Sequence, residues 1–416
     1  MTDRHEKGRS LIPIGQTLPA LLPDRAGGSV LQRMARGALD IAQQFPRAAA
    51  SKRYRLGGHE FCEPDYRQVL LWAERLGMAP EVVIARLSAA RAEIDEQETI
   101  KLQIVEGHIR TLVWDGKELP LDKFEWLPGL AVEILAIKQH IPWTSDQPLP
   151  SLKRLHIRSG LTALDLRPVP GLTGLNCGDN GLTELDLSPV AGLTELDCSY
   201  NYLAKLDLNP VPKLTKLDCS QNQLAALDLS PVPRLTSLDC DVNQLTELDL
   251  SPVPRLTSLD CYDNQLTELD LSPVPRLTSL ACGANPLNKL DLSPVPELTS
   301  LACGENQLTK LDLRPVPALT FLNCGYNRLT ELDLSPVPAL TILWCQENQL
   351  SELDLSPVSG LTLLICVENH LAVLDLNPVP ALTRLDCRSN QLTALDLRPV
   401  PKLWPFYADG QVNIKR

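Results

Sequence analysis

The sequence has few of the residues on which catalytic and cofactor-binding sites depend. Aromatic residues make up 4% of the 416 residues, and the six histidines stand singly. No Walker loop, G-x-S-x-G, H-E-x-x-H or G-x-G-x-x-G motif occurs, so the sequence patterns of nucleotide-binding proteins, serine esterases and zinc proteases are missing. We therefore expect a protein that is not an enzyme and that has no cofactor and no metal.

Long apolar runs are also missing. No stretch of about 18 uncharged apolar residues occurs, and Pro13, Gly15 and Pro19 interrupt the apolar residues near the N-terminus, so we expect neither a membrane span nor a signal peptide. The net charge is −12, and the acidic excess lies within residues 152–402. This charge disfavours binding to nucleic acids and to anionic membranes. We expect a soluble protein of the cytoplasm.

What the sequence does contain is a repeat of 21 residues. Eleven units follow one another without an insertion, from LTGLNCGDNGLTELDLSPVAG at Leu172 to LTRLDCRSNQLTALDLRPVPK, which ends at Lys402. A shorter twelfth unit begins at Leu152, and Val132, Leu135 and Ile137 suggest a fainter copy before it. A fixed period of this length is typical of stacked repeat architectures.

Each unit reads LxxLxCxxNxL followed by LxxLDL, and it resembles the bacterial leucine-rich repeats with 21-residue nested units. The units are also similar to those of septation-initiation-type scaffold proteins. The resemblance implies a leucine-rich repeat solenoid of stacked, mostly β coils with parallel strands. It also implies a non-enzymatic protein-interaction scaffold or adaptor. The resemblance specifies the fold more closely than the activity, because many unrelated functions share this architecture.

The rest of the chain suggests five segments. We expect residues 1–28 to be disordered, residues 29–100 to form a small α-helical domain, and residues 101–151 to supply capping strands and a degenerate first coil. Residues 152–402 are the twelve repeats, and residues 403–416 are a C-terminal cap. Helices are expected from Ser29, from Glu63 and from Pro80, and a strand pair should turn near Glu106 and Gly107. Two prolines in the SPVP turn exclude a helix there, so the second half of each unit is predicted to be a second extended face.

Twelve cysteines raise the question of a redox or metal site. Eleven recur every 21 residues at an inward-facing position, from Cys177 to Cys387. They lack the close pairs of a zinc site, and we interpret them as a buried ladder of free thiols, with disulfides as the alternative. Cys62 stands outside the ladder, and His59 nearby makes it the one candidate for a catalytic thiol.

Two further columns recur at fixed positions. The asparagines from Asn180 to Asn390 are expected to bond the backbone of their turns. The aspartates from Asp165 to Asp396 occupy every unit, and like charges at this spacing repel each other. We expect each carboxylate to accept a hydrogen bond from the following turn or from a Thr or Ser of the neighbouring coil. A ladder that binds calcium is the alternative.

The outward positions three and five of each strand vary, and they are the candidate contact positions. Large apolar side chains gather in adjacent units, and an acidic stretch precedes them. We predict that a protein partner, one with a basic surface, binds here. The predicted partner-binding residues are Phe321, Tyr326, Ile342, Trp344, Leu363, Ile365 and Val367, together with Asp197, Asp218, Asp239 and Asp260.

Several alternatives remain open at this stage. The apolar residues could instead join copies of the chain into a homo-oligomer or a self-associating array, or they could be covered by residues 403–416. A secreted bacterial effector that acts on host proteins through the same surface is a second function, and an enzyme within residues 29–100 is a third. The sequence names no partner.

Overall fold

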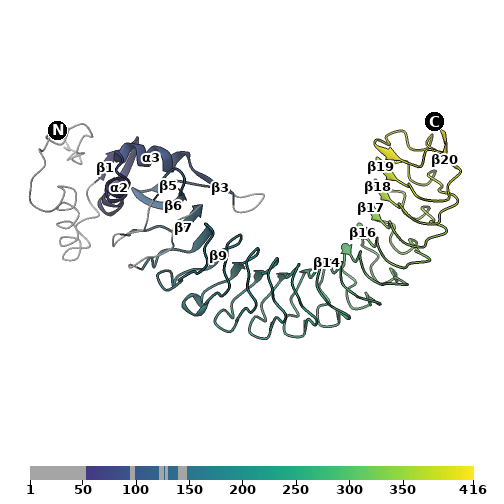
Figure 1. Ribbon diagram of the computed structural model, residues 1–416, viewed down its shortest axis with the longest axis horizontal. Helices are drawn as coiled ribbons and strands as arrows, with labels where there is room; N and C mark the ends of the chain where they lie inside the picture. Colours follow the sequence, from purple (N-terminus) through teal and green to yellow (C-terminus); the bar gives the residue numbers. More distant parts are fainter. Residues whose placement is uncertain (1–52, 94–98, 121–125, 127–129, 139–147) are drawn as a thin grey trace, which may run out of the picture. The chain divides into compact units, whose positions relative to one another are not determined.

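The chain forms stacked coils, and it divides into two compact units. The computed structural model describes residues 53–93, 99–120, 126, 130–138 and 148–416, and the helix expected from Ser29 and the disorder expected for residues 1–28 lie outside this part. The first unit comprises residues 1–193 and the second residues 194–416. The two units are shown in Figure 1.

The first unit begins with a hairpin and two helices. Helix α2 starts directly after β2, with Pro64 in its first turn, and ends at Gly77, whose φ of 63° is the left-handed conformation that a glycine adopts at low cost. Helix α3 ends at Ala89, and residues 91–93 after it pair with β4. The elements are β1 (Arg53–Leu56), β2 (His59–Cys62), α2 (Glu63–Leu76), α3 (Pro80–Ala89), β3 (Arg91–Glu93) and β4 (Thr99–Lys101). The expected α-helical domain therefore also contains strands.

A buried carboxylate joins α2 to the sheet of the first unit. Asp65 is fully buried, and it accepts hydrogen bonds from the backbone N–H of Ile109 and from Nδ1 of His108, both at 2.9 Å. Burial raises the pKa of Asp65, and these two donors act in the opposite direction. Trp72 of α2 packs edge-to-face on Trp114 and on Trp126, with ring centroids 4.9 and 5.6 Å apart. These contacts place the helix against the first coil.

The repeat register begins earlier than the repeated sequence does. Strand β6 follows the predicted turn at Glu106 and Gly107 and pairs in parallel with β7, so that one column of buried leucines reads Leu112, Leu135, Leu155 and Leu175. The faint copy before Leu152 therefore contributes a strand in the register of the repeats, and β6 adds a further strand in that register. The strands are β5 (Gln103–Val105), β6 (His108–Asp115), β7 (Ile134–Lys138), β8 (Arg154–Arg158) and β9 (Gly174–Asn176), and a 3₁₀ turn spans Ser188–Val190.

The second unit is a regular parallel stack. Its strands are β10 (Glu195–Asp197), β11 (Lys216–Asp218), β12 (Ser237–Asp239), β13 (Ser258–Asp260), β14 (Ser279–Ala281), β15 (Ser300–Ala302), β16 (Phe321–Asn323), β17 (Ile342–Trp344), β18 (Leu363–Ile365), β19 (Arg384–Asp386), β20 (Ala394–Asp396), β21 (Phe406–Tyr407) and β22 (Asn413–Lys415). From β10 to β19 each residue pairs with the residue 21 positions later. Strands β16 to β19 lie on the concave side of this unit (Figure 1).

The second half of each repeat contains no α-helix and ends in a turn, as expected. Among the described coils it is a β-strand only in the last, where β20 pairs with β22. Elsewhere the Leu-Asp-Leu stretch leads into two consecutive tight turns, such as Val211 N–H to Leu208 O and Leu214 N–H to Val211 O, both at 3.0 to 3.1 Å. A 3₁₀ turn lies at Ser188–Val190, where Ala191 replaces the second proline of the turn.

Asparagine side chains close the other turn, as expected. Asn264 donates to the carbonyl oxygens of Cys261 and Tyr262 in its own coil and of Cys240 in the preceding coil, and it accepts from the N–H of Leu245. The residue before each of these asparagines has φ between 45° and 55°, from Asp179 to Ser389. Because that conformation is costly for residues other than glycine, the asparagine bonds must stabilise the turn.

We predict that Asn264→Ala lowers the urea midpoint of unfolding, since it leaves the carbonyl oxygens of buried turns without a donor. The expected cost is about 3 kcal/mol. The exposed neighbour Gln265 is the control, and Gln265→Ala should change stability by less than about 0.5 kcal/mol. Equal effects of the two substitutions would show that the asparagine column does not hold the coils together.

Candidate functional site

The strand face of the second unit is the candidate site. On each of β10 to β18 the central leucine is buried and the two flanking residues, at positions three and five of the repeat, are at least partly exposed. Because the strands pair in register, each position forms a straight column with one residue per coil, about 4.8 Å apart. The chemistry of the face therefore changes along the stack in steps of one strand.

The predicted apolar residues do come together. We call Phe321, Ile342, Trp344, Leu363 and Ile365, with Tyr326 and Val367 at the adjoining turns, the apolar patch. Phe321, Ile342 and Leu363 are paired along one column, and Trp344 and Ile365 along the next. The rings of Phe321 and Trp344 lie edge-to-face with centroids 5.9 Å apart. Trp344 is 36% exposed and Tyr326 45%.

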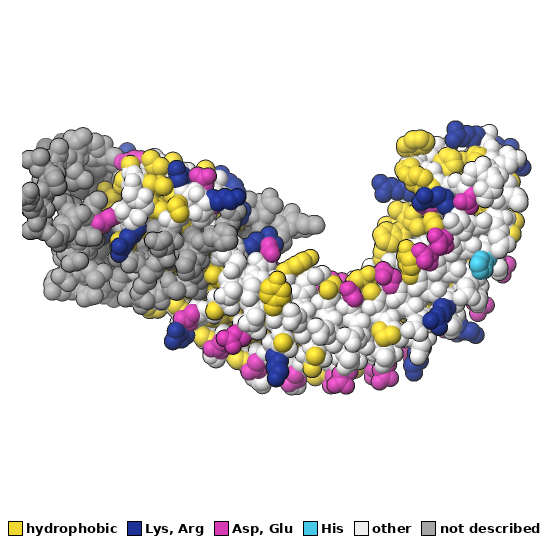
Figure 2. Space-filling view, in the orientation of Figure 1, with side chains coloured by type: hydrophobic (Ala, Val, Ile, Leu, Met, Phe, Trp, Pro, Cys, Tyr) yellow, Lys and Arg dark blue, Asp and Glu magenta, His cyan; other side chains and the backbone are white. Residues whose placement is uncertain are grey.

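Figure 2 shows hydrophobic side chains gathered on the strand side at the level of β16 to β18. The C-terminal segment does not cover them. Strand β21 continues the sheet beside β19, with Phe406 opposite Leu385 and Tyr407 opposite Asp386, so residues 403–416 form one more coil. Trp404 of that segment is itself 79% exposed. The alternative that this segment covers the apolar patch is therefore wrong, because its backbone is used to close the edge of the sheet.

The predicted acidic residues also lie in one column, which we call the acidic ladder: Asp197, Asp218, Asp239 and Asp260. Each accepts a hydrogen bond from the N–H two residues later, at 3.0 to 3.2 Å. Asp241 lies at the adjoining turn, where its Oδ1 is buried without a protein partner. Oxygens of Asp239, Asp241 and Asp260 lie within 4.8 Å of one another.

Burial and mutual repulsion change the acidity of this ladder. Burial, with the neighbouring Asp218 second, raises the pKa of Asp239 to about 7, and burial together with Asp260 raises the pKa of Asp241 to about 6. Burial also raises the pKa of Asp218 and of Asp260. A cation placed beside these carboxyls would favour their charged form and so oppose the rise in pKa.

Two coils with small side chains separate the ladder from the apolar patch, so the two are not direct neighbours. Strands β14 and β15 present Ser279, Ala281, Ser300 and Ala302, which we call the small-residue floor. Along its turn side Tyr262 donates a hydrogen bond to Glu305 Oε1, two coils further on, at 2.9 Å. The tyrosine ring passes over Gly283, where a Cβ would come within 2.9 Å of the ring.

Basic side chains follow the apolar patch at its other end. Arg384 and Arg388 are exposed on the coil of β19, and Arg388 pairs with Asp386 at 2.5 Å and lies 5.1 Å from the ring centre of Tyr407. Lys and Arg side chains are visible beyond the patch in Figure 2. The predicted partner-binding residues do not include this basic end, although the change of position three from Leu363 to Arg384 is visible in the sequence.

The other aspartate column has the predicted structural role. Each of its twelve carboxylates accepts a hydrogen bond from the N–H two residues later, as Asp186 does from Ser188 at 2.9 Å. These bonds lower the pKa of several members, and the added Arg314 guanidinium lowers that of Asp312 to about 2. The bonds explain the column without a bound calcium ion.

The cysteine ladder is buried and all twelve thiols are free. Burial raises the pKa of every ladder thiol from Cys219 onward, and that of Cys303 reaches about 12. Such thiols form little thiolate and are poor nucleophiles.

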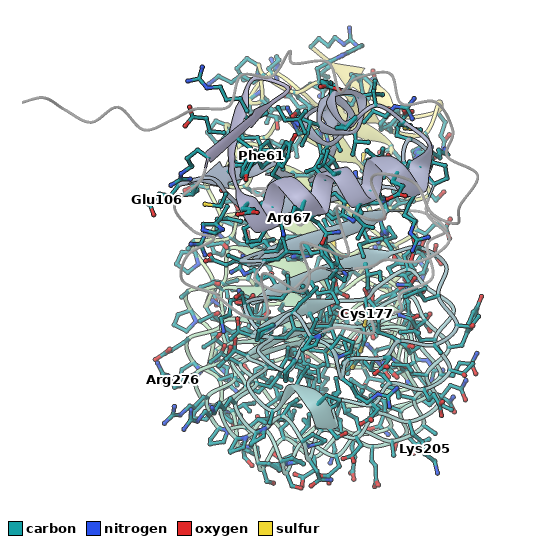
Figure 3. All side chains as sticks on the ribbon, turned by 90° about the vertical axis from the view of Figure 1, so that its left-hand side faces the viewer. Phe61, Arg67, Glu106, Cys177, Lys205 and Arg276 are labelled. Carbon is teal, nitrogen blue, oxygen red and sulfur yellow. The ribbon has the colours of Figure 1, made fainter. Side chains whose placement is uncertain are left out.

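Cys62 also lacks the geometry of a catalytic thiol. It is buried, its Sγ lies 3.4 Å from the carbonyl oxygen of Glu106, and burial raises its pKa. Side chains alternate along β2, so Cys62 and His59 point to opposite faces, and the His59 ring packs near Phe61 instead. Figure 3 shows Phe61 and Glu106 in this part of the first unit.

Comparison with known proteins identifies the architecture. No protein-family model and no curated protein sequence matches the chain. Among solved structures, the chain is similar to the functional domain of InlJ from Listeria monocytogenes, described as including a cysteine ladder, with 39% identity over 64% of this chain and a TM-score of 0.60. The chain spans 60% of that protein.

Two further solved structures share the fold. The leucine-rich repeat protein LIC12759 from Leptospira interrogans has 20% identity over 67% of this chain and 84% of its own, with a TM-score of 0.56. The internalin InlF from Listeria monocytogenes has 22% identity over 73% of this chain and 90% of its own, with a TM-score of 0.53. The protein is a leucine-rich repeat solenoid with 21-residue repeats, as predicted.

We predict that Asp239→Asn raises the melting temperature at pH 8 and has a much smaller effect at pH 4. A carboxyl whose pKa is raised in the folded state makes the fold lose stability as pH rises from the unfolded pKa of 3.8 to the folded value of about 7, and the loss stays constant above that value. Asn323 bonds its turn in the same way, so the hydrogen bond is retained. The exposed Asp263→Asn is the control, and an Asp239→Asn effect that does not depend on pH would refute the interpretation.

We also predict that the native chain resists a thiol reagent. Ellman's reagent should modify fewer than one thiol per chain within minutes, and all twelve after denaturation, because the native thiols are buried. Rapid modification of Cys62 alone would restore it as a candidate nucleophile.

Proposed function

We propose that the protein is a non-enzymatic scaffold or adaptor that binds a protein partner on the strand face of its second unit. The observation that carries the proposal is the apolar patch, which gathers seven large side chains from three adjacent coils and leaves Trp344 and Tyr326 exposed. Soluble proteins seldom leave such a group in water unless it binds something.

The aromatic side chains would be the anchors of this interaction. Phe321 and Trp344 are already fixed against each other, so little conformational entropy is lost when a partner covers them. Covering an aromatic side chain removes on the order of 100 Å² of apolar surface from water, which contributes a few kcal/mol. The acidic ladder would direct the choice of partner toward a basic surface and would make association sensitive to salt.

Self-association through this surface is less favoured. In the second unit the strands lie on the concave side (Figure 1), and two concave faces do not fit together. The apolar patch is suited to a convex or narrow element of another protein. An effector that acts on proteins of another organism would use the same surface, so the two functions differ only in where the partner resides.

The place of action is also part of the proposal. We propose the cytoplasm, since twelve free thiols are stable in a reducing compartment. Location outside the cell is the alternative, and the burial of the ladder is compatible with it. Among the described helices, of 14 and 10 residues, none has the length and apolar character needed to cross a membrane. The proposal includes no septation-specific role, because the resemblance to those scaffolds rests on the repeats alone.

The test is affinity capture from an extract of the source organism with wild type and with a Trp344→Asp/Ile365→Asp variant. Charges placed in the apolar patch should lower capture of a specific protein at least tenfold. Val373→Asp is the matched control, because Val373 belongs to the coil of Ile365, lies outside the strand face and is 73% exposed. The captured protein is then purified and its Kd measured, and identical Kd values for wild type and the double variant would overturn the proposal.

A further inference from the structure

The strand face of the second unit is ordered along the stack by charge and by side-chain size. From β10 to β19 it passes from the acidic ladder to the small-residue floor, then to the apolar patch, and finally to Arg384 and Arg388. The order is asymmetric, so a ligand that matches it has only one favourable orientation.

The spacing of these regions is set by the register of the strands. Asp260, Ala281, Ala302, Asn323 and Trp344 occupy successive places in one column. Four strand steps of about 4.8 Å separate Asp260 from Trp344, which is about 19 Å. An extended polypeptide advances about 3.4 Å per residue, so about five residues would lie between a group at Asp260 and a group at Trp344. A helix would need about twelve residues for the same distance.

The floor between the two regions suits a polypeptide backbone. Serine and alanine side chains extend only a short way from the strands, so a ligand backbone can approach closely. The hydrogen bond between Tyr262 and Glu305 lines the turn side of the floor. The Tyr262 ring can lie over Gly283 because this residue has no side chain. At the end of the floor, next to Ser300 in the same column, stands Phe321, the first large residue of the apolar patch.

We propose that the occupant is one extended segment of a partner protein that lies across the strands, with basic residues over the acidic ladder and, about five residues away, large apolar residues on the patch. This inference rests on the proposed function and specifies the partner's chemistry. Basic side chains complement the carboxylates of Asp239, Asp241 and Asp260, and the segment would end near Arg384 and Arg388, which favour acidic residues beyond the apolar ones.

The test uses synthetic peptides and the full chain. Each fluorescent peptide carries two lysines, a spacer of alternating threonine and serine, and a leucine–phenylalanine pair, with spacers of two, five or twelve residues. Fluorescence anisotropy at low salt and pH 7.5 should give a Kd for the five-residue spacer that is at least tenfold lower than for the other two. A lower Kd for the twelve-residue spacer would contradict the spacing of an extended ligand and overturn the proposal, as would equal values or no binding by any peptide.

Three variants separate this proposal from the proposed function. An Asp239→Asn/Asp260→Asn variant should remove the dependence on spacer length, and Ala302→Gln should weaken only the five-residue peptide by filling the floor. Trp344→Asp should abolish binding of every peptide. If Trp344→Asp abolishes binding while spacer length has no effect, the docking surface stands and the extended ligand is refuted.

Discussion

A column of asparagine side chains, one in each of the eleven full repeats from Asn180 to Asn390, bonds the turns of successive coils to one another. The amide group of Asn264 reaches three carbonyl oxygens and one N–H, in two successive coils. These bonds stabilise a turn whose preceding residue has a positive φ, and they keep the strands in exact 21-residue register. Every other column depends on that register, because a shift by one residue would place leucines on the surface and charged side chains in the core.

The same register also arranges the side chains of the strand face in straight columns. Positions three and five of the repeat tolerate any side chain that does not disturb the backbone, so the chemistry of these two columns is free to vary along the stack. In the second unit this freedom yields an acidic ladder, a small-residue floor, an apolar patch and a basic end in that order. Repulsion within the ladder is the cost of the arrangement, and burial with like-charged neighbours raises the pKa of Asp239 to about 7.

The sequence predicted much of this fold because a repeat contains its own structural code. Leucine spacing identified the strands, and the recurrence of Cys177 to Cys387 and of Asn180 to Asn390 identified buried columns that the structure confirms. The composition of columns three and five located the apolar patch. Whether the second half of a repeat is a paired strand could not be predicted, because alternation of Leu, Asp and Leu suits a paired strand as well as an unpaired segment, and pairing depends on the adjacent coil.

Other features were beyond local sequence patterns. Strand β6 keeps only Leu112 of the repeat pattern, since Trp114 takes the place of the usual cysteine, and its pairing with β7 is what reveals its register. The hydrogen bond between Tyr262 and Glu305 joins residues 43 positions apart and depends on Gly283 between them. Buried Asp65 bridges α2 to β6 across a similar distance in the sequence. Such contacts follow from how coils and helices stack.

The central claim is that a partner protein sits on the strand face of the second unit. Site-specific photo-cross-linking in living cells tests it most directly, with p-benzoylphenylalanine placed at Phe321, at Tyr326 or, outside the strand face, at Val373. The account predicts that one partner is cross-linked from positions 321 and 326 and not from position 373. Cross-linking of the partner from position 373 alone would contradict it.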